Sequence, residues 1–120
     1  MHYFSPTDSC MRVFDVEQEK WKIYTKKDGL PRFGASIYDP KSKRFYLVGG
    51  IEEGRYGQKS NSIIWFSLKD GWGEAKMEKG RSSAMVTMIE SDDNGYNDLL
   101  IAGGIDENQK HLKNCELFKP

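Results

Sequence analysis

Two glycine pairs in this chain each follow an apolar run, an arrangement that binds phosphate in some proteins. The run FYLVGG ends at Gly49 and Gly50, and the run LLIAGG ends at Gly103 and Gly104. A glycine-rich loop binds phosphate when it leads into the N-terminus of a helix, whose backbone N–H groups face the anion. No helix start follows either pair, and the acidic residues that come next would repel a phosphate group. We therefore expect the glycine pairs to have a structural role.

The segment ESDDNGYND has oxygen-bearing side chains that could bind a calcium ion. Glu90, Asp92 and Asn94 stand at positions 1, 3 and 5 of a calcium loop, with Gly95 at position 6. Position 12, however, is Ile101 instead of the glutamate that such loops use to bind the ion with both oxygens. Because Asn-Gly favours a tight turn between strands, we interpret the segment as a long hairpin turn.

The two cysteines and two histidines match no known pattern for metal binding or nucleophilic catalysis. Cys10 and Cys115 lack zinc-ligand spacing, so a metal site would need both to converge with His2 and His111. No local motif supports a Cys–His nucleophilic pair, and no carboxylate pair falls in a recognisable acid–base motif. The histidines are therefore interpreted as solvated loop residues, and the sequence predicts no catalytic residue, no metal site and no cofactor.

The composition indicates a single domain without bulk charge. Its 120 residues include 18 basic and 18 acidic side chains, so the formal net charge is zero. This balance argues against binding of nucleic acid or anionic membranes. No apolar stretch is long enough to span a bilayer, and the N-terminus lacks the apolar core of a signal peptide, so we expect a cytoplasmic protein. Hydrophobic residues make up only 38%, which fits many half-buried strands better than a bulky helical core.

An internal repeat organises the chain. Residues 32–51 (RFGASIYDPKSKRFYLVGGI) and 81–105 (RSSAMVTMIESDDNGYNDLLIAGGI) both begin with Arg, have Ala three residues later and end in Gly-Gly-Ile. A second signature extends the repeat, since Phe14, Phe66 and Phe118 close similar apolar runs and lie 52 residues apart (66 − 14 and 118 − 66). The chain is therefore built from copies of one unit.

Each unit is predicted to contain four short strands separated by turns. No apolar pattern of helical period persists along the chain. In the first complete unit the expected strands cover residues 35–38, 45–48 and 63–67, followed by a weak run after Trp72. The connecting sequence DPKSK is typical of a turn between strands.

The repeated elements together resemble the kelch repeat: Arg-x-x-Ala, an apolar run ending in Gly-Gly, a strand ending in an aromatic residue, and a tryptophan. The resemblance runs from about Cys10 to Phe118 and implies an all-β fold of about two four-stranded antiparallel blades of a β-propeller. Residues 1–31 would form the end of one blade, 32–80 a complete blade and 81–120 an incomplete blade. Closed propellers typically have about four to eight blades, so we expect an unclosed segment, completed by further blades or by self-association.

The resemblance also implies a function. Kelch propellers commonly act as non-catalytic protein-interaction modules, for example in substrate receptors of ubiquitin ligases and in actin-associated proteins. In the ligase adaptors, one face grips a peptide through the Arg that opens the first strand and through residues just after the glycine pair. Carried over to this chain, the partner-binding positions are Arg32, Ile51, Glu52, Arg81, Ser82, Ile105 and Asp106.

Other interpretations stay open at this point. The two arginines could instead brace the blades by hydrogen-bonding to backbone, and the chain could be a fragment of a galactose-oxidase-like propeller enzyme. The two cysteines fall in equivalent strands two units apart, so we expect both to be free thiols. The aromatic residues that recur with the repeat are interpreted as core between the blades. They are Phe14, Trp21, Phe66, Trp72 and Phe118.

Overall fold

The structure, a computed structural model, describes residues 2–7, 10–26, 29–52, 58–91 and 95–120. These residues form ten β-strands and no helix, which confirms the all-β fold that the sequence predicts. The strands are β1 (His2–Thr7), β2 (Cys10–Asp15), β3 (Lys20–Thr25), β4 (Ala35–Asp39), β5 (Arg44–Val48), β6 (Ser62–Ser67), β7 (Gly71–Lys76), β8 (Met85–Ile89), β9 (Asp98–Ala102) and β10 (Cys115–Phe118).

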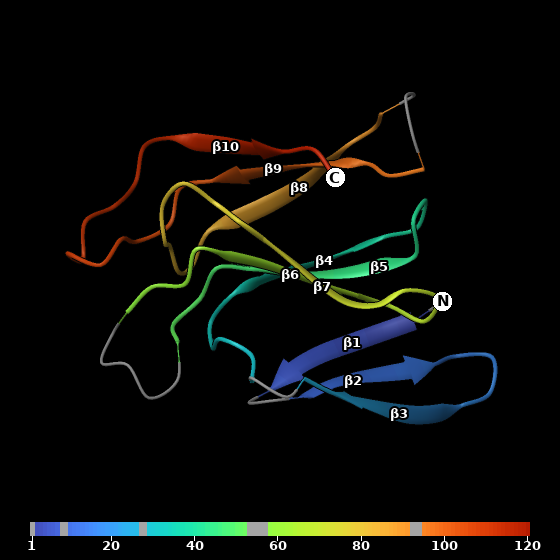
Figure 1. Ribbon diagram of the computed structural model, residues 1–120. Helices are drawn as coiled ribbons and strands as arrows, with labels where there is room; N and C mark the ends of the chain where they lie inside the picture. The colour runs from blue at the N-terminus through green and yellow to red at the C-terminus, as the bar shows by residue number, and fades with distance from the viewer. Residues whose placement is uncertain (1, 8–9, 27–28, 53–57, 92–94) are drawn as a thin grey trace.

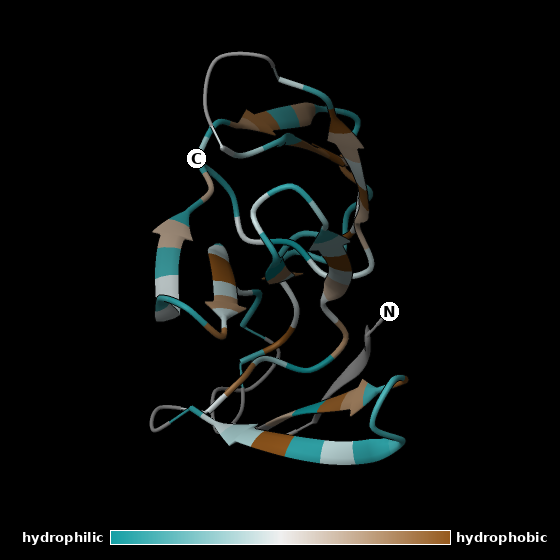
Figure 2. Cartoon of the chain, turned by 90° about the vertical axis from the view of Figure 1, so that its right-hand side faces the viewer, coloured by the Kyte–Doolittle hydropathy of each residue, from teal (hydrophilic) through white to brown (hydrophobic). Residues whose placement is uncertain are grey.

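The strands form three antiparallel sheets that lie in three layers (Figure 1). The N-terminal sheet has the order β1-β2-β3, the central sheet β4-β5-β6-β7, and the C-terminal sheet β10-β9-β8. Within each sheet, strands that follow one another in sequence are neighbours in space, and no sheet closes on itself. Apolar and polar residues alternate along several of the strands (Figure 2), the period expected when the two faces of a sheet differ.

The central sheet agrees with the sequence prediction to within one residue at each strand that the sequence delimits. The N-terminal part differs from it. The sequence assigns residues 1–31 to the end of a blade and marks within them only the apolar run that Phe14 closes. In the structure β1 precedes that strand and pairs with it from His2 opposite Asp15 to Thr7 opposite Cys10. The glycine pair that follows this strand in the other units does not follow residues 2–7, so the repeat gave no signal there.

The glycine pairs have the structural role that the sequence indicates. Gly50 has a φ of 107° and Gly104 a φ of 97°, backbone angles that favour glycine. A Cβ atom on Gly50 would lie 2.5 Å from the carbonyl oxygen of Arg32, and one on Gly104 would lie 2.7 Å from that of Ser82. The missing side chains therefore let the segment before each first strand pass directly against the end of the second strand.

The central sheet is apolar on both faces and packs on both neighbours. Towards the C-terminal sheet, Tyr46 and Ile63 are buried in one cluster with Leu99 and Ile101. Towards the N-terminal sheet, an equivalent cluster contains Phe45 and Phe66 of the central sheet with Met11 and Val13 of the N-terminal sheet. The hydrophobic core therefore consists of two layers, one on each side of the central sheet.

A buried carboxylate also joins the central and C-terminal sheets, at the hairpin turn between β4 and β5. Asp39 is fully buried and accepts hydrogen bonds from the hydroxyl of Ser42 (2.6 Å) and from the side-chain amide of Asn97 (2.9 Å). It also accepts the backbone N–H groups of Lys41 (2.9 Å) and Asn97 (3.1 Å). Since Asn97 immediately precedes β9, this residue pair fixes one end of the two sheets to each other.

The recurring aromatic residues do not all lie in the core. Phe66 and Trp72 form a ring pair with centroids 4.9 Å apart within the layer between the N-terminal and central sheets. Their counterparts Phe14 and Trp21 form the same pair at 5.1 Å, but Trp21 is 56% exposed. The expectation of a core role is therefore wrong for Trp21, because no other sheet formed by the described residues covers that face of the N-terminal sheet.

Candidate functional site

The residues carried over from the kelch resemblance lie at one end of the sheets, in two equivalent clusters. Arg32 and Ile51 exchange backbone hydrogen bonds of 2.9 and 2.6 Å, and Ser82 and Ile105 exchange the equivalent pair at 3.1 and 2.8 Å. A backbone hydrogen bond of 2.8 Å from Gly50 N–H to the carbonyl of Arg81 connects the two clusters. We call this end of the sheets the loop rim, defined by residues 29–34, 49–52, 58–61, 77–83 and 103–114.

Arg81 is part of the loop rim but is not accessible to a partner. Its side chain is fully buried, and one guanidinium nitrogen lies 2.5 Å from a carboxylate oxygen of Glu116. The guanidinium also donates to the carbonyl of Gly103 (2.9 Å) and to the side-chain oxygen of Asn114 (3.3 Å). The partner-binding expectation for Arg81 is therefore corrected to the bracing role, and Ser82, which is 4% exposed, is equally inaccessible.

Arg32, which the sequence repeat aligns with Arg81, has an exposed side chain. The structure places the two arginines one residue out of that alignment. Arg32 bridges Ile51 as Ser82 bridges Ile105, so the structural counterpart of Arg32 is Ser82. Because successive residues of an extended segment point to opposite sides, the two arginines have different surroundings.

The acidic residues after the glycine pairs each make a backbone hydrogen bond to a residue further along the chain. Backbone hydrogen bonds run from Glu52 N–H to Gln58 (3.0 Å) and from Asp106 N–H to Lys110 (2.9 Å). The Asp106 carboxylate in addition accepts the N–H groups of Lys110 (3.0 Å) and Asn108 (2.9 Å). The hydrogen bond from the Lys110 amide lowers the pKa of Asp106, so this carboxylate holds its turn in shape. Ile51 and Ile105, which precede these acidic residues, are half-buried.

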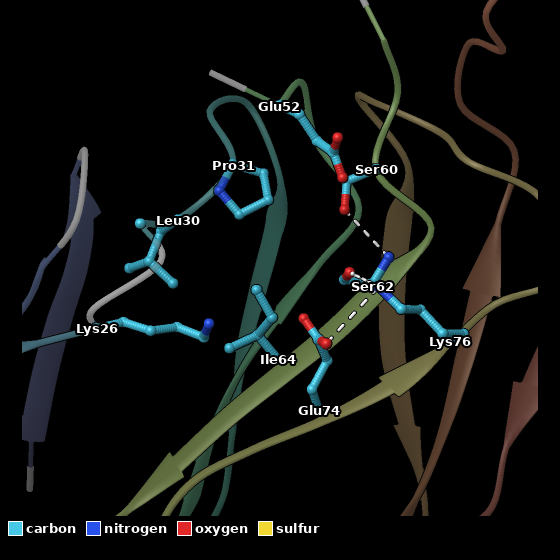
Figure 3. A pocket seen from close by; sticks show the side chains of 10 residues that line it. Lys26, Leu30, Pro31, Glu52, Ser60, Ser62, Ile64, Glu74 and Lys76 are labelled. Atoms are coloured by element: carbon cyan, nitrogen blue, oxygen red, sulfur yellow. Dashed lines mark hydrogen bonds and ion pairs between the residues drawn. The ribbon is translucent and has the colours of Figure 1, made fainter. Parts of the chain in front are cut away.

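A cavity of about 470 Å³ opens at the loop rim, between the segment that follows β3 and the central sheet (Figure 3). Leu30, Pro31 and Ile64 supply its apolar surface, and Lys26 extends towards it from the N-terminal side. The polar part of the lining comes from Glu52, Ser60, Ser62, Glu74 and Lys76.

The charged groups of this cavity alternate in sign. The Lys76 ammonium donates to the Ser62 hydroxyl at 2.7 Å and lies 3.6 Å from the Glu74 carboxylate. Figure 3 shows the Glu74 carboxylate on the same side as the Lys26 amine, with Glu52 at the upper edge. Such a surface can bind a ligand that carries both an acidic and a basic group.

Sequence reasoning placed Glu52 at the site but missed Lys26, Glu74 and Lys76. Glu74 and Lys76 are two residues apart on β7 and therefore project from the same face of the sheet. The alternation of residues along β7 can be seen in the sequence, but the sequence does not show which face of this strand borders a cavity.

A second cavity, of about 430 Å³, lies at the opposite end of the same layer. Its lining is mainly apolar and includes Tyr24, Tyr38 and Phe45. Burial raises the pKa of Tyr38, in keeping with this apolar environment. None of the residues carried over from the kelch resemblance lines it.

The remaining candidate residues lie on different elements of the fold. His2 lies in strand β1 instead of a loop, whereas His111 is an exposed loop residue bridged to Ile105, as expected. Cys115 is an exposed free thiol. Among the described residues, no group of three His, Cys, Asp or Glu side chains is arranged to hold a metal ion. Residues 92–94 of the calcium-like segment lie outside the described residues, and the segment connects β8 and β9, which pair as a hairpin.

Comparison with known proteins gives information on the fold alone. No protein-family model matches the chain, and no curated protein matches it. The chain is similar to a solved structure described as that of YjhT, with a TM-score of 0.63 and 18% sequence identity over 84% of this chain. The match covers 29% of that protein, so this chain spans less than a third of its length. In the described part of the chain, no helix is long and apolar enough to cross a membrane.

Proposed function

We propose that the chain is a kelch-type portion of a β-propeller, with its three sheets as successive blades, and that it is a non-catalytic protein-interaction module. The proposal is supported by the repeat, by the four-stranded central sheet that packs on a neighbour at each face, and by the glycine pairs that hold the loop rim. In this interpretation the chain belongs to an adaptor, such as a ubiquitin-ligase substrate receptor or an actin-associated protein.

The observation that carries the binding role is the alternating charge of the loop-rim cavity. Lys26 and Lys76 line it together with Glu52 and Glu74, and Arg32 is exposed at the same rim. A purely acidic or purely basic partner would meet like charges there, which lowers its affinity. The ligand that fits is a protein segment with acidic and basic side chains close together.

The revised binding site therefore keeps Arg32 and Glu52, leaves out Arg81 and Ser82, and adds three side chains of the cavity. Ile51, Ile105 and Asp106 shape the rim without lining the cavity. The residues added are Lys26, Glu74 and Lys76.

The experiment is affinity capture of partners from a cell extract, followed by measurement of each partner's affinity for purified variants. Arg32→Ala and the charge-removing pair Glu74→Gln/Lys76→Gln should each weaken binding. Loss of one member of a hydrogen-bonded interfacial charge pair typically costs about 2 kcal/mol or more, which is roughly a thirtyfold rise in Kd.

Arg12→Ala is the matched control, because Arg12 is an exposed arginine on β2, away from the loop rim. It should leave Kd unchanged. Full retention of every partner by folded Arg32→Ala and Glu74→Gln/Lys76→Gln proteins would show that the loop rim is not the binding site.

A further inference from the structure

Two sheet faces of this chain are uncovered and apolar, one at each end of the three layers. On the outer face of the N-terminal sheet, Trp21 is 56% and Ile23 62% exposed. On the outer face of the C-terminal sheet, Met85 is 76% and Leu117 50% exposed. Exposed apolar surface gathered on a whole sheet face is typical of an interaction surface.

The N-terminal face repeats a surface that is already used inside the chain. Phe14 and Trp21 lie opposite each other on β2 and β3, as Phe66 and Trp72 do on β6 and β7. The inner pair, Phe66 and Trp72, packs against the preceding sheet in the same cluster as Val13. The outer pair has nearly the same ring separation, 5.1 against 4.9 Å, and so presents the same aromatic shape to solvent.

The C-terminal face repeats the surface of the N-terminal sheet on which the ring pair Phe66 and Trp72 packs. Leu117 precedes Phe118 by one residue, as Val13 precedes Phe14. Val13 is 4% exposed because the Phe66 side of the central sheet covers it, whereas its counterpart Leu117 is half exposed. In the same way Cys115 is the counterpart of Met11, and Met11 is buried whereas Cys115 is exposed. The N-terminal face therefore has the shape of the central-sheet surface with the ring pair, and the C-terminal face has the shape of the surface on which that pair packs.

We infer that a second copy of this 120-residue chain covers these faces, with the N-terminal face of each copy packed on the C-terminal face of the other. The contact reproduces the internal contact between the central and N-terminal sheets. An interface between two different patches closes into a ring when the rotation between copies allows it. Here two copies contribute three sheets each and make a ring of six.

The number of copies follows from the range of closed propellers, which is about four to eight sheets. One copy has three sheets and falls below this range, and three copies would have nine and exceed it. Two copies therefore give the one closed ring within the range. This inference does not depend on partner binding at the loop rim, and its test measures mass instead of affinity for a partner.

The test is light scattering coupled to size-exclusion chromatography on the purified chain across a dilution series. The wild type should have twice the chain mass of 13.8 kDa. Trp21→Glu places a charge in the N-terminal face and Leu117→Lys places one in the C-terminal face, so each variant alone should be monomeric. A mixture of the two should regain a 1:1 dimer, because one intact face of each kind remains.

Phe33→Lys is the matched control, since Phe33 is 73% exposed but lies in the loop before β4, outside both faces. It should stay dimeric. Circular dichroism establishes that each variant is folded, and Ile23→Lys and Met85→Lys replace a variant that is not.

Three results would overturn the inference. A monomeric wild type at every concentration means that the faces do not associate. A dimer that persists in either Trp21→Glu or Leu117→Lys means that like faces pair with each other. Wild-type assemblies that grow with concentration beyond two copies mean that the ring does not close.

Discussion

Replacing Arg81 by Met tests whether this arginine braces the sheets. Arg81 is fully buried and Glu116 has a side chain that is 16% exposed, so Arg81→Met leaves a largely buried carboxylate without its cation. Removing one partner of a buried ion pair typically costs about 3–5 kcal/mol. Glu116 keeps a hydrogen bond of 2.7 Å from the backbone N–H of Glu78, which favours the lower part of that range.

The assay is chemical and thermal unfolding of the monomeric Leu117→Lys background, so that association does not contribute. A loss of about 3 kcal/mol in a chain of this size corresponds to a fall of about 10–15 °C in Tm. Arg32→Met is the matched control. Its arginine lies in the corresponding segment before β4 but is exposed, so the loss should stay below about 1 kcal/mol.

The double variant Arg81→Met/Glu116→Leu separates the charge from the packing. It removes both buried charges and should recover most of the lost stability, because apolar replacements of a buried pair are often neutral. Equal losses for Arg81→Met and Arg32→Met would refute the bracing role and return Arg81 to the candidate binding residues.

Three further predictions concern the core and the glycine pairs. Burial raises the pKa of Tyr46, whose side chain is fully buried, so in the folded state it ionises at higher pH than the ordinary value of about 10. The contribution of Tyr46 to stability should therefore be constant below about pH 10 and fall above it, as this tyrosine ionises in the unfolded chain. Above about pH 10 the urea midpoint should fall less steeply in Tyr46→Phe than in the wild type. In the same monomeric background, Trp72→Ala should lower the free energy of unfolding by about 3–5 kcal/mol, and Trp21→Ala by much less, since Trp21 is 56% exposed. Equal losses of stability in urea unfolding would contradict the assignment of Trp72 to a covered face and Trp21 to an uncovered one. Gly50→Ala should destabilise the chain more than Gly71→Ala, although both glycines have positive φ, because only at Gly50 would the new Cβ meet a carbonyl oxygen, at 2.5 Å. The strain common to both substitutions is about 1–3 kcal/mol, and thermal unfolding of the two variants gives the difference.

The sequence predicted most of the fold because its signals are local. Turn sequences and apolar runs place β4, β5 and β6, and the glycine pairs mark where β5 and β9 end. β1 was missed because it lacks the glycine pair, and its only strand signal is a short run that includes Pro6. The pairing of β1 with β2 depends on neighbouring strands and not on a motif of its own.

The candidate site was harder to predict, because burial depends on the exact register of a segment and on what lies across the sheet. Arg32 and Arg81 align in the sequence repeat, yet one is exposed and the other buried. In the structure the counterpart of Arg32 is Ser82, a shift of one residue that the sequence does not indicate, because both segments carry the pattern Arg-x-x-Ala. Trp21 shows the same limit, since its repeat position indicates core but its sheet has no neighbour on that side.

Two buried polar contacts join the central and C-terminal sheets, and they imply that the three sheets do not all separate from one another at once. Asp39 holds the central and C-terminal sheets at the hairpin end, and Arg81 with Glu116 holds them at the loop rim. The contact between the central and N-terminal sheets is instead built on the apolar cluster of Met11 and Phe66. Apolar layers can separate without first breaking buried ion pairs, so sub-global opening should begin between β2 and β6. Backbone amides of β5 and β9 would then be the last to exchange with solvent deuterium, and those of β3 among the first.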